Sequence, residues 1–115
     1  MNKDVAIGVF LFTMCHVVGW FGNALQFMSD WWASRPLLTV AIFSVPTGAF
    51  AFYAVRYAYA GFDGSLWSAR FLGFSASWLV FPVLTWLFLG ESMFTAKTMI
   101  CTVLSFAILA VQIYG

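Results

Sequence analysis

Four long apolar segments, separated by short polar breaks, make up nearly the whole of this chain. They cover about residues 5–28, 36–60, 67–90 and 98–114. A helix that crosses the hydrocarbon layer of a membrane needs roughly 20 mostly apolar residues, and each segment comes close to that length. Strand-like alternation is absent, and the segments are too long for the strands of a barrel. The pattern predicts an all-α membrane protein with four transmembrane helices joined by short loops.

The breaks between the segments carry the charges, glycines and capping residues that are typical of helix ends. They lie at residues 29–35, 61–65 and 91–97. Pro36 suits the first turn of a helix, where its missing N–H costs nothing. Pro46 and Pro82 fall inside segments, where proline is expected to kink a helix. We therefore expect residues 1–115 to form a single four-helix transmembrane domain.

The composition points to lipid as the main partner of this chain. The sequence is 63% hydrophobic and only 8% charged, whereas soluble domains contain roughly 25% charged residues. A soluble domain of this size leaves too much surface exposed to hide so much apolar area. The net charge of +1 comes without a clustered basic face, so nucleic-acid binding is not expected.

The basic residues divide almost evenly between the two ends of the predicted bundle. Four helices place Lys3, Arg56 and Arg70 on one side and Arg35 and Lys97 on the other. A bias of three against two sets the orientation only weakly under the positive-inside rule. Insertion in both directions and a single orientation with cytoplasmic termini both stay open.

The charged residues near the segment ends are expected to anchor the helices at the membrane surfaces. Arg56 and Arg70 flank the second loop and can extend to the same surface, with Asp63 between them as a partner for either. Glu91 and Lys97 bracket the third loop in the same manner. We interpret Arg56, Arg70 and Glu91 as interface charges.

A polar stripe runs along the first segment. His16, Gly19, Asn23 and Gln26 recur at spacings of three, four and three, which places them on one helix face. Lipid cannot satisfy such side chains, so the polar stripe is expected to face protein or a water-filled cavity. It is either a packing seam or the lining of a substrate path. Trp78 joins it as a candidate because aromatic faces attract organic cations.

His16 stands deep inside the first segment. Ionisable residues within a membrane are candidates for function, and histidine ordinarily changes charge near neutral pH. The alternative is a neutral histidine that donates to a carbonyl of a neighbouring helix. Cys15 and Cys101 fit neither a disulfide framework nor a metal-ligand spacing. No nucleophile–base pair can be assembled, so we expect no metal, no cofactor and no enzymatic activity.

Small residues recur every four positions in the third segment. Ala69, Gly73 and Ser77 form a small-residue ladder. Helices in lipid associate through small residues that let their backbones approach closely. The ladder is therefore predicted to be a helix-packing seam.

The third segment also ends in a recognisable motif. Its last residues are Phe88-Leu89-Gly90-Glu91, followed by a short loop and a last apolar helix. This resembles the Phe/Tyr-Leu-Gly-Glu ending common in the drug/metabolite transporter superfamily. The length, short loops and balanced charges resemble its small multidrug resistance proteins, and Arg56 is shared with an uncharacterised four-helix branch. The resemblance implies a transporter of small organic solutes that works as a dimer in a bacterial inner membrane.

One departure separates this chain from the small multidrug exporters. Those proteins carry a glutamate midway along the first helix, which binds the cation and the protons. The equivalent position falls near Met14, and no acidic residue stands within the first segment. His16 is two residues away and belongs to a different helix face. Two functions stay open, a small transporter and a non-transporting accessory subunit of a larger membrane complex.

Overall fold

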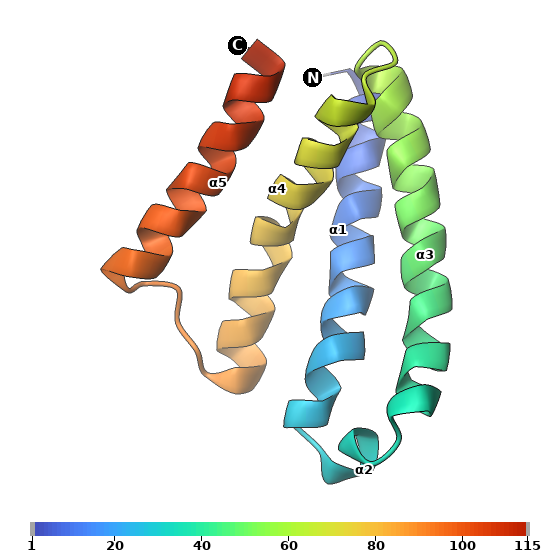
Figure 1. Cartoon of the computed structure of the whole chain (residues 1–115), viewed down its shortest axis with the longest axis vertical. Helices are drawn as coiled ribbons and strands as arrows, with labels where there is room; N and C mark the ends of the chain where they lie inside the picture. Colours follow the sequence, from blue (N-terminus) through green and yellow to red (C-terminus); the bar gives the residue numbers. More distant parts are fainter. Residues whose placement is uncertain (1, 115) are drawn as a thin grey trace.

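The computed structural model describes residues 2–114, and its long helices follow the four predicted segments (Figure 1). They are α1 (Lys3–Ala24), α3 (Pro36–Gly61), α4 (Leu66–Leu84) and α5 (Ala96–Tyr114). A 3-10 turn, Leu25–Phe27, continues α1, and a π-helical turn, Thr85–Leu89, continues α4. All four are long and apolar enough to cross a membrane, and residues 2–114 contain no strand. The predicted all-α, multi-pass membrane protein is confirmed.

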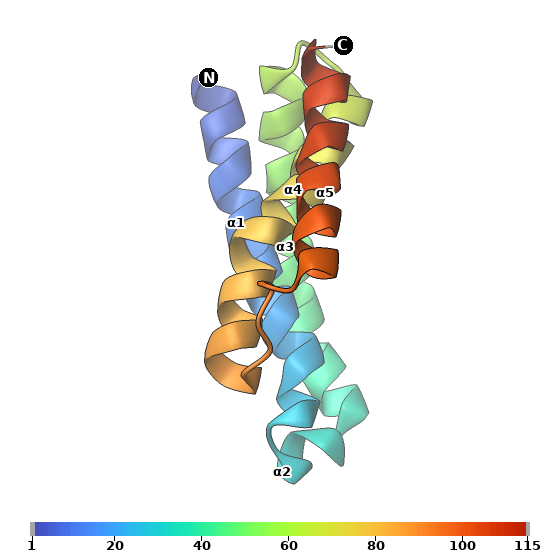
Figure 2. The same cartoon turned by 90° about the vertical axis from the view of Figure 1, so that its left-hand side faces the viewer.

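The helices lie roughly side by side in a flattened bundle (Figures 1 and 2). Its dimensions are 45 × 35 × 18 Å, and the longest matches the roughly 40–45 Å thickness of a bilayer with its headgroups. Of the described long helices, α1, α3 and α4 all contact one another, whereas α5 contacts α4 alone. The chain therefore consists of a three-helix unit with a fourth helix attached at its side.

A single helical turn replaces the plain loop expected at residues 29–35. This turn, α2 (Asp30–Ala33), lies at the end of the bundle opposite the 62–65 loop (Figure 1). The ring of Trp32 meets those of Trp31 and Phe43 edge to face, at centroid distances of 4.9 and 5.8 Å. The contact with Phe43 holds α2 against α3.

The start of α1 is joined to the end of α3 by one asparagine. The Asn2 side chain accepts a hydrogen bond from the Val5 N–H at 2.9 Å and donates to the Gly61 carbonyl at 2.7 Å. Glycine is needed at position 61, because a Cβ there would lie 2.6 Å from the Val5 side chain. After the loop, Ser65 caps α4 by accepting from the Ser68 N–H at 3.1 Å.

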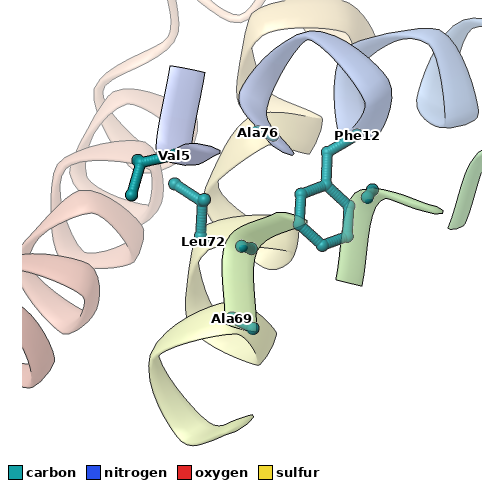
Figure 3. Packing of buried hydrophobic residues seen from close by; sticks show 7 residues of the cluster. Val5, Phe12, Ala69, Leu72 and Ala76 are labelled. Carbon is teal, nitrogen blue, oxygen red and sulfur yellow. The ribbon is translucent and has the colours of Figure 1, made fainter. Parts of the chain in front are cut away.

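The packed core lies in the half of the bundle next to the 62–65 loop, and Figure 3 shows its side chains from close by. It consists of Val5, Phe12, Ala54, Ala58, Ala69, Leu72 and Ala76. Ala54, Ala58 and Ala69 are 0% exposed, because small side chains let the three backbones approach closely. The core therefore uses the first half of α1, the second half of α3 and the first half of α4.

The small-residue ladder of α4 divides at the edge of this core. Ala69 lies inside the core, and a Cβ on Gly73 would lie 2.7 Å from Cε1 of Phe12. Ser77 is only half-buried, and its hydroxyl donates to the Phe74 carbonyl of its own helix at 2.6 Å. Ala69 and Gly73 thus pack within the chain, whereas Ser77 lies beyond the core.

The two internal prolines have different consequences. α3 continues through Pro46 as one helix, whereas α4 changes to π-helical winding three residues after Pro82. Proline has no N–H to donate to the carbonyl four residues earlier, so helical hydrogen bonding is already incomplete there. Gly90, with a φ of 72°, ends this turn in a left-handed conformation that glycine adopts without strain.

Candidate functional site

A cavity of about 850 Å³ lies between α1 and α4 in the half of the bundle away from the core. Its lining comes from the second half of α1, from Thr47 of α3 and from the second half of α4 with the residues that follow. Pockets for small organic ligands commonly measure about 300–1,000 Å³ and are mostly apolar with a few polar groups. The size and lining of this cavity agree with that description.

Three members of the polar stripe, His16, Gly19 and Asn23, line the cavity. The fourth, Gln26, is not among the described lining residues, and its amide donates to the Asn23 carbonyl at 2.8 Å. Trp78 is also outside the described lining, and its buried indole N–H has no partner within residues 2–114. The structure thus brings together the first three candidates but not Gln26 or Trp78.

His16 connects α1 to α4. Its Nε2 lies 2.7 Å from the Gly73 carbonyl oxygen. A carbonyl only accepts hydrogen bonds, so Nε2 carries the proton, and in a neutral ring Nδ1 is left as an acceptor. The half-buried His16 also lines the cavity. The geometry of His16 is therefore compatible with both interpretations of this residue. It bonds to a carbonyl of a neighbouring helix, and it also lines a cavity.

Thr47 supplies the contribution of α3 to the same wall. Its carbonyl accepts from the Cys15 thiol at 3.5 Å, whereas its own buried hydroxyl has no partner within the described chain. Gly19 leaves room beside it, since a Cβ at Gly19 would lie 3.6 Å from Cγ2 of Thr47. Buried polar groups are usually hydrogen-bonded, so this hydroxyl is an unsatisfied polar group beside the cavity.

A buried hydrogen bond fixes the π-helical turn against α1 further along the cavity. The Trp20 indole N–H donates to the Thr85 hydroxyl at 3.0 Å. The rings of Trp20, Phe21 and Phe88 lie 5.2–5.7 Å apart, two of the three pairs edge to face. π-Helical turns are rare and occur frequently at functional sites. Here the turn forms part of the wall, since both Thr85 and Leu89 line the cavity.

Glu91 also lines the cavity, and among the described lining residues it is the single charged one. The side chain is exposed. Its place directly after Gly90 is consistent with a surface charge, and the sequence offered no reason to connect it with the polar stripe of α1. Thr47 and Thr85 could have been suspected of lining a site from the sequence, since both are polar positions inside apolar segments.

The two arginines near the second loop lie at the core end of the bundle, away from the cavity. The Arg56 guanidinium lies over the rings of Phe52 and Tyr53, at 4.8 and 5.2 Å from their centroids. Arg70 instead lines a second hollow between α3 and α4. These charges are therefore separate from the cavity, unlike Glu91.

Comparisons of the chain with protein-family models, curated proteins and solved structures find no match. Within residues 2–114, no three His, Cys, Asp or Glu side chains come together in a way that could hold a metal ion. Any functional assignment therefore depends on the cavity and on the residues that line it.

Proposed function

We propose that this chain is a transporter-like unit for a small organic solute in a bacterial inner membrane, and that it works as a homodimer. The cavity of about 850 Å³ is the observation that carries the proposal. Transporters bind their substrates near the membrane midplane between helices, and this cavity begins about halfway along α1 at Cys15 and His16.

The lining suits a solute that has an apolar body and a hydrogen-bonding group. Trp20, Phe27 and Phe81 provide apolar surface, and His16 and Asn23 provide polar atoms. A few convergent polar groups in an apolar pocket orient a ligand, while burial of its apolar surface supplies affinity. We therefore expect amphiphilic molecules of drug-like size to bind more strongly than small polar ones.

The dimer would complete the wall of the cavity. In the described chain α5 contacts α4 alone, so α5 covers the cavity neither on its α1 side nor on its α3 side. Polar groups such as Asn23, which is exposed in the single chain, are costly against lipid. A second copy placed over this side would cover them and enclose the solute.

One observation favours a second candidate, a non-transporting accessory subunit. The polar stripe already finds partners within the chain, because His16 bonds to the Gly73 carbonyl and the Asn23 amide donates to the Gly19 carbonyl at 3.0 Å. These hydrogen bonds are sufficient for a polar stripe that serves only to pack helices. Purification of the chain in a stable complex with other membrane proteins, without a homodimer, would favour this candidate.

The transporter proposal is tested by filling the cavity. The full chain is reconstituted into vesicles, and the flux of a panel of neutral, acidic and basic amphiphiles is measured. Ser77→Phe places a ring in the cavity, whereas Ser44→Phe, on an exposed position of α3, is the matched control. We expect flux of at least one compound to be lost in Ser77→Phe and retained in Ser44→Phe.

Cysteine labelling supplies an independent test of binding. Cys15 lines the cavity, whereas Cys101 is exposed on α5. A transported compound should slow alkylation of Cys15 by a small maleimide and leave Cys101 unaffected. Vesicles no more permeable than protein-free ones, together with unprotected Cys15, would refute the proposal.

A further inference from the structure

A second hollow of about 500 Å³ lies where α3 and the beginning of α4 meet. It is lined by Val55, Leu66, Trp67 and Arg70. Three of these side chains are apolar, the fourth is a cation, and no acidic residue belongs to the described lining. The hollow therefore combines an apolar surface with one positive charge.

Arg70 differs from the other two arginines in having no partner among the residues that the structure describes. Arg35 lies 4.2 Å from the Trp31 ring centroid and donates to the Trp31 carbonyl at 2.9 Å. Arg56 lies over two rings of its own helix. Within residues 2–114, the Arg70 guanidinium makes neither a hydrogen bond nor a cation–π contact. Its charge is therefore available to an anion from outside the chain.

The depth of Arg70 makes an unpaired charge costly. It lies four residues after Leu66, the first residue of α4, which corresponds to about 6 Å along the helix. An arginine just inside the hydrocarbon layer extends towards the headgroups or pairs with an anion there. Trp67 stacks on Phe71 at a centroid distance of 5.9 Å, and tryptophan is typical of this interfacial level. The hollow thus lies at the depth where lipid phosphates and acyl chains meet.

We propose that this hollow binds one anionic phospholipid. The phosphate accepts hydrogen bonds from the Arg70 guanidinium, whose planar fork matches two phosphate oxygens. The upper part of an acyl chain covers Val55, Leu66 and Trp67, of which Leu66 and Trp67 are 60% and 69% exposed in the single chain. A lipid with a net negative charge is preferred because the charge of the hollow is positive and uncompensated.

Native mass spectrometry of the full chain tests this proposal. The chain is released from detergent that contains equal amounts of phosphatidylglycerol and phosphatidylcholine with the same acyl chains. We expect one phosphatidylglycerol to be retained in preference, and Arg70→Gln to lower its apparent affinity about tenfold, as for loss of one charge-assisted contact. Arg56→Gln is the matched control, because that guanidinium is already occupied by two rings. Equal retention in Arg70→Gln and parent, or equal loss in both variants, would overturn the site.

The acyl chain and the phosphate are tested separately. Leu66→Ser should weaken retention, whereas Leu37→Ser, at a still more exposed position near the start of α3, should not. Inorganic phosphate in excess should leave the lipid bound, because inorganic phosphate cannot replace the contacts that the acyl chain makes. Displacement by inorganic phosphate, or unchanged retention in Leu66→Ser, would show that the hollow is not a phospholipid site. Helix content by circular dichroism confirms that each variant is folded.

Discussion

The Nε2 atom of His16 lies 2.7 Å from the carbonyl oxygen of Gly73, at the level where the packed core ends and the cavity begins. On one side of this bond, Phe12 fills the space that a side chain at position 73 would need. On the other side, α1 and α4 both line the cavity. One hydrogen bond thus marks the boundary between the part of the bundle that holds the helices together and the part that is able to hold a solute.

We predict that His16→Leu abolishes solute flux while the chain stays folded. Loss of the bond to Gly73 should lower stability by only about 1 kcal/mol, a usual value for interhelical hydrogen bonds in membranes. His16→Gln retains a side-chain donor for the Gly73 carbonyl, so it should restore the stability lost in His16→Leu. Vesicle flux and thermal unfolding in detergent measure the two effects. Parental flux in His16→Leu would exclude a role for this residue in the path.

We predict that Gly73→Leu disrupts packing between α1 and α4. Its Cβ would lie 2.7 Å from the Phe12 ring, and overpacking of this kind typically costs about 1–3 kcal/mol. Gly48→Leu is the matched control, because a Cβ at Gly48 meets no atom within 4 Å. Thermal unfolding in detergent and crosslinking of the oligomer should distinguish the two. Equal stability of both variants, with an unaltered oligomer, would contradict the close contact.

We predict a measurable coupling between Trp20 and Thr85. Thr85→Val leaves the buried indole N–H without its acceptor, and Trp20→Phe leaves the hydroxyl without its donor. A double-mutant cycle should give a coupling of about 1 kcal/mol in thermal unfolding. Ser44→Ala, at an exposed position of α3, should have little effect. Additive single-variant effects would mean that this bond does not hold the π-helical turn to α1.

We predict that the orientation of the chain is sensitive to single charges. Arg70 belongs to the end of the bundle with the 62–65 loop, whereas Ser34 follows α2 at the opposite end (Figure 1). Because basic residues divide three against two, removal of Arg70 or insertion of a lysine near Ser34 should shift the topology. Reporter fusions after Gly115 measure the fraction in each orientation. The same single orientation in all variants would refute this prediction.

The helices could be predicted from the sequence because length and hydropathy are local properties. The expected segment 36–60 is found as Pro36–Gly61, and the expected segment 98–114 as Ala96–Tyr114. The π-helical turn Thr85–Leu89 was not predicted, since it depends on packing against Trp20 as well as on Pro82. The turn α2 was also missed, because its aromatic contact with Phe43 joins residues from different elements.

The neighbours of each helix could not be predicted in the same way. In lipid, the outward face of a helix is as apolar as its packed face, so hydropathy does not separate them. The spacing of His16, Gly19 and Asn23 did identify the face that lines the cavity. It could not show that Glu91, far away in the sequence, reaches the same space, because that depends on how α4 lies against α1.

The confinement of the core to one half of the bundle makes α4 a long segment that is attached to α1 at two separate places. Its close approach to α1 at Gly73 lies about 16 Å from Leu84, the last α-helical residue of α4. Just beyond Leu84, the Trp20–Thr85 hydrogen bond holds the π-helical turn to α1. If that second attachment opened, a tilt of about 10° around Gly73 would displace the far end of α4 by about 3 Å, while the alanines at the core moved very little. The spacing of α1 and α4 around the cavity therefore depends on the contacts at the π-helical turn.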